Sequence, residues 1–142
     1  MGGFLSRFSP LALIGALLMG GTALADPTED YRDGVTAARA GHMDEAITAF
    51  SHIIDGGASG QAVETNNLAS VYNLRGMCHE AKNETDQALA DYSKAIEIDP
   101  KMAEAYGNRA MLYAKFGDKD KAKADATAAK RIDYKVKVPK FD

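Results

Sequence analysis

The sequence predicts an all-α fold built from three copies of a helix-turn-helix unit. Residues 69–100 and 103–134 align without a gap, so that Tyr72 falls on Tyr106 and Arg75 on Arg109. Within each copy, small and aromatic residues recur at i, i+4 and i+7, which is one face of an α-helix. A glycine or an asparagine interrupts this pattern midway through each copy, as is typical of a helix end.

A third copy lies upstream, in residues 27–55, where Gly34 takes the place of Gly76 and Phe50 that of Tyr92. Its spacing from the second copy is longer than the spacing between the second and third, because additional residues fall within the glycine-containing stretch DGGASGQAVETNN. Each unit can bury its apolar face only against its neighbours, so three copies are close to the minimum that a stable fold needs.

Breakers and caps divide the chain into its expected helices. We expect six helices, over residues 27–40, 43–55, 60–81, 85–97, 101–115 and 118–131. Gly41, Asn83 and Gly117 fall between paired helices, where a left-handed residue would end the first helix. Asp99 ends the fourth helix because Pro100 disfavours α geometry in the residue before it. Asp99 is then expected to cap the next helix, with Pro100 in its first turn.

Small residues at fixed points predict how the paired helices pack. Gly76 and Ala88 have little or no side chain, so their helices can approach closely there, while Tyr72 and Tyr92 fill the space on either side. Cys78 is the single cysteine and cannot form an internal disulfide. Its apolar neighbours favour a buried filler over a reactive thiol.

The N-terminal segment, residues 1–25, differs from the rest of the chain. It contains one cation, Arg7, no acidic residue, an apolar core over residues 11–19 and small residues that end at Ala25. This pattern is typical of a secretory signal peptide that is cleaved after Ala25, although an uncleaved anchor helix is the alternative. We therefore expect an exported, periplasmic protein whose helical domain covers residues 26–134.

Charge is distributed unevenly along the chain. Without the signal peptide there are 16 Lys and Arg residues against 20 Asp and Glu. Residues 26–114 hold 7 cations and 15 acids, whereas residues 115–142 hold 9 cations and 5 acids. The overall acidity argues against nucleic acid as a partner. The end of the chain, DYKVKVPKFD, contains the C-terminal tail, residues 135–142; we favour a frayed tail, with an extended peptide that pairs with something as the alternative.

The repeat resembles the tetratricopeptide repeat family. The residues of the second copy that carry the resemblance are Tyr72, Gly76, Ala88, Tyr92, Ala95 and Pro100. The chain departs from the family pattern at Arg75 and Arg109, where the family often has leucine, and at His79 and Ala126, which replace aromatic residues. Tyr134 replaces the final proline, in a terminal copy where atypical residues are expected.

The resemblance implies a right-handed α-solenoid whose first helices form a concave groove for a peptide or protein partner. The groove residues that it implies are Tyr31, Val35, Asn73, Met77, Glu80, Gly107, Met111 and Lys115. Flexible methionines next to polar groups suit an adaptable peptide-binding surface, although Met77 and Met111 could instead belong partly to the core. The carboxylate-binding clamp of some family members has no matching set of residues here.

Candidate catalytic and metal-binding motifs are missing from the sequence. His42, His52 and His79 form no H-x-x-x-H pair, and there is no C-x-x-C, P-loop, G-x-S-x-G or G-x-G-x-x-G motif. We therefore predict neither catalysis, nor a metal, nor a cofactor, and no contact with a membrane once the signal peptide is removed. The expected function is binding of another protein or peptide. The alternative is a structural envelope protein that forms homo-oligomers through its terminal repeats.

Overall fold

The computed structural model describes residues 27–58 and 65–141. These residues form six α-helices and no strand: α1 (Pro27–Ala40), α2 (Met43–Ala58), α3 (Thr65–Ala81), α4 (Thr85–Ile98), α5 (Ala103–Lys115) and α6 (Lys119–Ile132). The predicted all-α fold of three helix-turn-helix units is confirmed. The predicted signal peptide, residues 1–25, lies outside the described residues. None of the described helices is both long enough and apolar enough to cross a bilayer.

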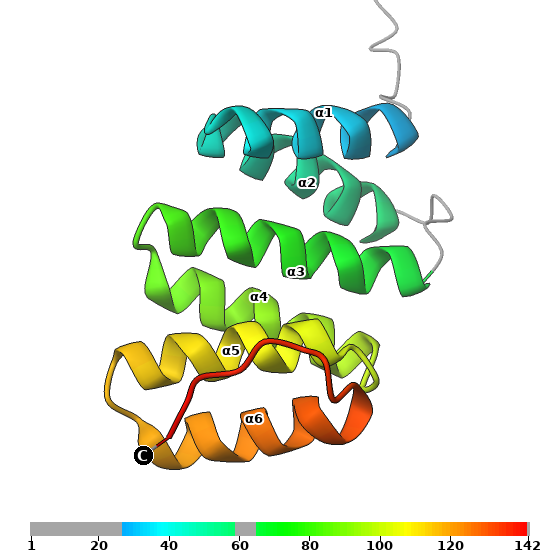
Figure 1. The fold of residues 1–142 in the computed structure, drawn as a ribbon. Helices are drawn as coiled ribbons and strands as arrows, with labels where there is room; N and C mark the ends of the chain where they lie inside the picture. The colour runs from blue at the N-terminus through cyan, green and yellow to red at the C-terminus, as the bar shows by residue number, and fades with distance from the viewer. Residues whose placement is uncertain (1–26, 59–64, 142) are drawn as a thin grey trace, which may run out of the picture.

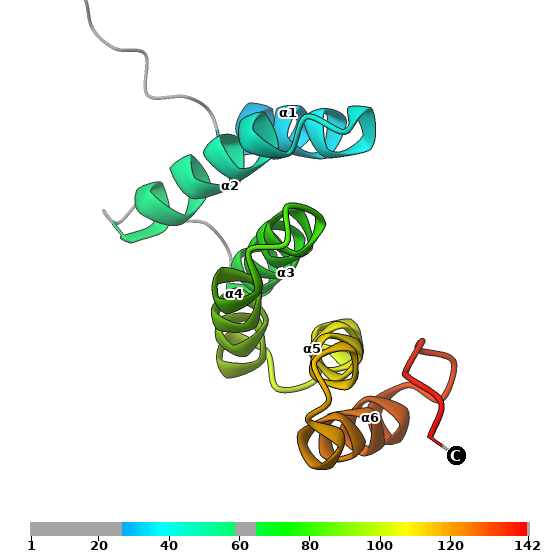
Figure 2. The ribbon, with the colours of Figure 1, turned by 90° about the vertical axis from the view of Figure 1, so that its left-hand side faces the viewer.

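The three hairpins stack one after another into a helical solenoid (Figures 1 and 2). Within each hairpin the two helices pack together, as α1 with α2, α3 with α4, and α5 with α6. Between hairpins, α2 packs against α3 and α4 packs against α5. Each hairpin therefore contacts only its neighbours along the stack, which is the arrangement of repeat proteins.

The helix bounds agree closely with the predicted ones, apart from the start of α3. The helix predicted over residues 43–55 continues to Ala58, and the one predicted from residue 60 is described from Thr65. Residues 59–64, within the glycine-containing insertion, lie outside the described residues. The hairpin turns are as predicted, because Gly41 (φ 84°), Asn83 (φ 61°) and Gly117 (φ 84°) all adopt the left-handed conformation.

The close approach of paired helices at Gly76 is confirmed, but the Tyr92 ring packs directly onto this glycine and not to one side of it. A β-carbon placed on Gly34 would lie 2.7 Å from the ring of Phe50, and one on Gly76 would lie 2.8 Å from the ring of Tyr92. Both rings are fully buried. Glycine in the first helix of these two hairpins thus makes room for an aromatic ring from the second helix.

In the third hairpin, smaller residues occupy the equivalent positions of the two paired helices. Ala126 replaces the aromatic ring, and Ala110 replaces the glycine opposite it. Both alanines are buried, at 5% and 0% exposure respectively. The departure from the family pattern at residue 126 is therefore matched by a residue on the facing helix that is larger than the usual glycine.

The connection from α4 to α5 differs from the prediction. Asp99 is extended (φ −125°, ψ 91°) after the end of α4, but α5 begins only at Ala103, with Met102 as its N-cap residue. The Asp99 carboxylate accepts a hydrogen bond from the Lys101 N–H (2.9 Å), and its carbonyl accepts one from the Met102 N–H (3.1 Å). Asp99 therefore closes a turn containing Pro100 and does not cap α5. Aspartate commonly bonds to its own backbone two residues on, which competes with a capping role.

The C-terminal segment also differs from the frayed tail that the sequence favoured. Residues 133–141, called the tail from here on, turn back after α6 and run beside α5 and α6 (Figures 1 and 2). Lys137 and Val136 of the tail lie directly over Gly107 of α5. The alternative considered for this segment, an extended peptide that pairs with something, describes it better, and its partner is the chain itself.

Candidate functional site

Three of the eight predicted groove residues expose large apolar side chains. Tyr31 on α1 is 41% exposed, Met77 on α3 is 47% exposed and Met111 on α5 is 46% exposed. They make up half of the six exposed large apolar side chains among the residues that the structure describes. Neither methionine belongs to a buried cluster, so both are surface residues. We call the surface that these three residues share the first-helix face.

Two other predicted groove residues serve mainly to hold helices together. Asn73 is 4% exposed, and its Oδ1 accepts a hydrogen bond from Asn108 Nδ2 (3.1 Å), which links α3 to α5. The Glu80 carboxylate accepts a hydrogen bond from the hydroxyl of Tyr92 (2.7 Å), which links α3 to α4. Burial, together with this hydrogen bond, raises the pKa of Tyr92. Asn73 is therefore closed to a ligand, and Glu80 already has a partner.

The remaining three predicted residues divide between core, tail contact and surface. Val35 is half-buried and packs against the core of the first hairpin. Gly107 is buried beneath the tail. Lys115 is exposed at the end of α5, with its Nζ 5.8 Å from the centre of the Phe116 ring. Of the eight predicted residues, Tyr31, Met77, Met111 and Lys115 are therefore the exposed ones.

Arg75, a departure from the family pattern, joins three helices. Its Nε and Nη2 donate to the two carboxylate oxygens of Asp91 on α4, at 2.9 and 2.8 Å. Its Nη1 donates to the hydroxyl of Ser51 on α2, at 2.9 Å. The hydrogen-bonded Asp91 carboxylate raises the pKa of Arg75, so the guanidinium stays charged. This arginine therefore holds its own hairpin together and ties it to the preceding one.

The same arrangement recurs one repeat later at Arg109. Its Nε and Nη2 donate to Asp125 on α6, at 2.7 and 2.9 Å, and its Nη1 donates to Ser93 on α4, at 2.9 Å. Neither link was among the predictions from the sequence. The available signal was an arginine followed by an aspartate at the same separation in both copies. Both arginines, which stand where the family often has leucine, therefore link helices through side-chain hydrogen bonds.

A second polar cluster surrounds the turn between α3 and α4. Lys82 Nζ lies 2.6 Å from a carboxylate oxygen of Asp44 on α2 and 2.7 Å from one of Glu84. The ring nitrogen Nδ1 of His79 lies 2.6 Å from the other Glu84 oxygen. Lys82, and then His79, lower the pKa of Glu84. His79, which replaces a family aromatic, therefore anchors this turn, as does Lys82.

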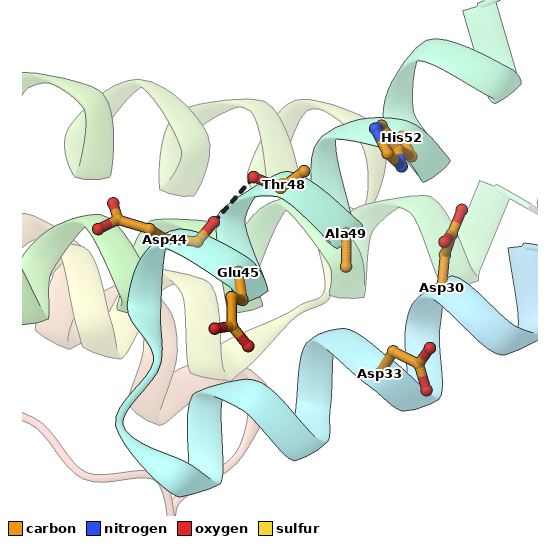
Figure 3. A pocket seen from close by; sticks show the side chains of 7 residues that line it. All are labelled: Asp30, Asp33, Asp44, Glu45, Thr48, Ala49 and His52. Carbon is orange, nitrogen blue, oxygen red and sulfur yellow. Dashed lines mark hydrogen bonds between the residues drawn. The ribbon is translucent and has the colours of Figure 1, made fainter.

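An open hollow between α1 and α2 is lined mostly by acidic residues (Figure 3). Its lining residues are Asp30, Asp33, Asp44, Glu45, Thr48, Ala49 and His52. Glu45 and Ala49 of α2 point toward α1 in the close-up, whereas Asp44 points away from it and pairs with Lys82. The hollow is a solvated acidic surface at the N-terminal end of the stack.

The single thiol and possible metal ligands bear on chemistry in the part of the chain that the structure describes. Cys78 is buried, and burial raises the pKa of its thiol, which makes it a poor nucleophile. Residues 27–58 and 65–141 contain no group of three or more His, Cys, Asp or Glu side chains placed to hold a metal ion. The distinctive feature of the first-helix face is therefore its exposed apolar side chains.

Comparison with known proteins identifies the repeat. Two family models, both described as tetratricopeptide repeat, match residues 69–102 and 92–124. Residues 69–124 are tetratricopeptide repeats. Residues 27–58 form a helix pair of the same design upstream of the matched region. Repeats of this family generally act as protein-interaction modules and typically serve as scaffolds, not enzymes.

A solved structure confirms the fold of the repeat array. The chain titled "MamA RS-1 ArsTM double mutant" superimposes with a TM-score of 0.67 at 14% sequence identity. The match covers 78% of this chain and 57% of that chain, so this protein corresponds to little more than half of its structural neighbour. At this identity the similarity concerns the fold alone. No curated protein sequence matches the chain significantly.

Proposed function

We propose that this tetratricopeptide-repeat protein binds a peptide or protein segment along its first-helix face. The observation that carries the proposal is the exposure of Met77 and Met111, which occupy equivalent positions of successive repeats on α3 and α5. Isolated exposed apolar residues are common on protein surfaces, whereas these two lie at one position of successive repeats, on helices that contact each other. Methionine side chains adapt to varied partners because they are flexible and polarisable.

The chemistry of the face suits an apolar or mixed peptide segment. Tyr31 extends the apolar surface onto α1, and Lys115 adds a cation at the end of α5. Helix-lined grooves commonly take extended or helical segments by burying a few apolar anchors. In this proposal the protein is a non-enzymatic binding module of the exported compartment, with no cofactor or metal and no nucleic-acid partner.

Site-specific photo-crosslinking tests the proposal. A photoreactive amino acid is placed at Met77 or Met111 in cells, with Ala90, an exposed residue of α4, as the matched control position. We expect one protein to be captured from both methionine positions and not from residue 90. Met77→Glu combined with Met111→Glu should abolish binding of that purified partner while leaving helix content unchanged. Capture of the same proteins from all three positions would contradict the proposal.

A structural, self-associating role is the second candidate, and the distribution of charge favours it. The hollow at the N-terminal end is acidic, whereas α6 and the tail carry most of the basic residues after position 115. Opposite charges at the two ends of the stack would favour head-to-tail association of copies. Sedimentation at increasing protein concentration tests this role, because a mass that rises with concentration and falls with added salt would support it. A constant monomer mass would exclude it.

A further inference from the structure

The tail covers a specific point of α5. A β-carbon placed on Gly107 would lie 2.6 Å from the carbonyl oxygen of Lys137 and 3.2 Å from Cγ2 of Val136. Both views of the fold place the tail on the side of α5 that faces away from α4 (Figures 1 and 2). The backbone of the tail therefore approaches the backbone of α5 as closely as a side-chain-free residue allows.

The point that the tail covers is equivalent to one that a helix covers in the preceding repeat. Gly107 aligns with Asn73 when the two repeats are superimposed in sequence. Asn73 on α3 is buried and bonded to Asn108 of α5. No helix follows α6 in the described residues, and the tail occupies the corresponding position on α5. The surface of α5 at Gly107 is thus a site against which another segment packs. In this structure the segment is the extended tail.

Gly107 has no side chain, which leaves room for the tail to pass close to α5. Glycine in a helix interior is unfavourable relative to alanine. Gly34 and Gly76, the glycines of α1 and α3, each lie beneath an aromatic ring of the paired helix. Gly107 instead lies beneath the tail backbone. The absence of a side chain at this position is explained by the passage of an extended chain over it.

The tail is held only lightly. Lys130 Nζ donates to the carbonyl oxygens of Tyr134 (2.7 Å) and Val136 (2.6 Å), and Lys123 Nζ lies 5.8 Å from the Phe141 ring centre. No tail residue from 133 to 141 is buried, and Tyr134 is 74% exposed. These contacts use two backbone carbonyls and one aromatic ring of the tail, which another extended segment with an aromatic residue also offers.

We propose that the tail is an intramolecular ligand that occupies a docking site for an extended peptide over Gly107. This inference rests on the proposed peptide-binding function of the first-helix face. It adds that the tail regulates the access of a partner at α5. An extended partner segment with apolar and aromatic side chains docks there by displacing the tail. Because a tethered segment acts at a local concentration in the millimolar range, the tail restricts the site to partners that compete effectively.

Protection of the tail in the full chain tests the contact itself. Gly107→Ala forces the Lys137 carbonyl away, so trypsin should cleave after Lys135 and Lys137 about tenfold faster than in the wild type. The Tm should stay equal or rise, because alanine favours the helix. Gly76→Ala is the matched control, with a lowered Tm and an unchanged cleavage rate in the tail. Equal cleavage rates in Gly107→Ala and the wild type would overturn the proposal.

Binding of a free peptide tests whether the site accepts a ligand in trans. A fluorescent peptide with the sequence of residues 133–142 is titrated into the full chain carrying Val136→Asp and Val138→Asp, which weaken the tail. We expect the peptide to bind this variant at least about tenfold more tightly than the wild type, because the tethered tail no longer competes. Adding Gly107→Ala should remove the binding. Failure of the variant to bind the peptide would show a fixed cap and overturn the inference.

The two proposals fail separately. A partner that crosslinks from the methionine positions with unchanged affinity in Gly107→Ala and in the tail variant would contradict the displacement inference and leave the first-helix face as the binding site. Conversely, a free peptide that binds over Gly107 while nothing is captured from Met77 or Met111 would support the docking site and contradict the wider face.

Discussion

Replacing Asp91 with asparagine should destabilise the protein strongly, because it removes the charged acceptor of Arg75. The Asp91 side chain is 7% exposed and that of Arg75 is 20% exposed, and two hydrogen bonds of 2.9 and 2.8 Å join them. Breaking a fully buried pair costs about 3–5 kcal/mol. Here the arginine reaches some water and keeps Ser51, so we expect about 2–3 kcal/mol. For a domain of this size, that loss lowers Tm by about 10–20 °C.

Thermal and urea denaturation, followed by far-UV circular dichroism, measure this effect. Glu97→Gln is the matched control, because Glu97 lies on the same helix and pairs with Lys94 at 2.8 Å, but is 69% exposed. An exposed pair of this kind contributes about 0.5 kcal/mol or less. Equal destabilisation by the two substitutions would refute the conclusion that Arg75 and Asp91 hold the hairpins together.

A double substitution separates loss of the pair from the penalty of an unpaired charge. Arg75→Leu with Asp91→Leu replaces the ion pair by apolar side chains, as the family often does at the arginine position. Such replacements are commonly neutral or stabilising, whereas removal of one partner is not. We expect the double variant to be more stable than Asp91→Asn alone. A double variant less stable than the single one would contradict this account.

Three further perturbations test other parts of the fold. Because the pKa of buried Tyr92 is raised, the unfolded state loses the Tyr92 proton at a lower pH than the folded state, so the stability should fall above about pH 10. Tyr92→Phe should make this fall less steep in urea denaturation measured at several pH values. An equally steep fall in the variant would contradict the prediction. Gly41→Ala should cost about 1–2 kcal/mol in the same assay, because φ is 84° there although the space is open. The pKa of Glu84 is lowered by Lys82, so its contribution is present at neutral pH and is lost as the pH falls from about 4.5 through the lower pKa of the folded state. Glu84→Gln should weaken this acid sensitivity, measured as the change in urea midpoint between pH 7 and about pH 3, and an unchanged difference would contradict it.

The repetition of the chain by itself determined the helical hairpins and their turns. Helices and left-handed stops depend on residues close together in the chain, which the sequence displays directly. The small and aromatic residues at the positions of Gly76 and Tyr92 therefore predicted close packing between paired helices. Asn83, between two helices, predicted a left-handed conformation at the turn. The repeat left open whether Met77 is exposed or partly in the core, and the structure places it on the surface.

Only the tertiary structure decided which polar residues pair across helices and where the tail lies. Arg75 reaches Asp91 and Ser51 because three helices meet at one register, which no local pattern specifies. Asn73, expected on an open surface, is buried where α3 meets α5. The tail has no helical period, and its position over Gly107 depends on how α5 and α6 are placed. Such contacts are set by the relative placement of whole helices, and therefore appear only once the chain has folded.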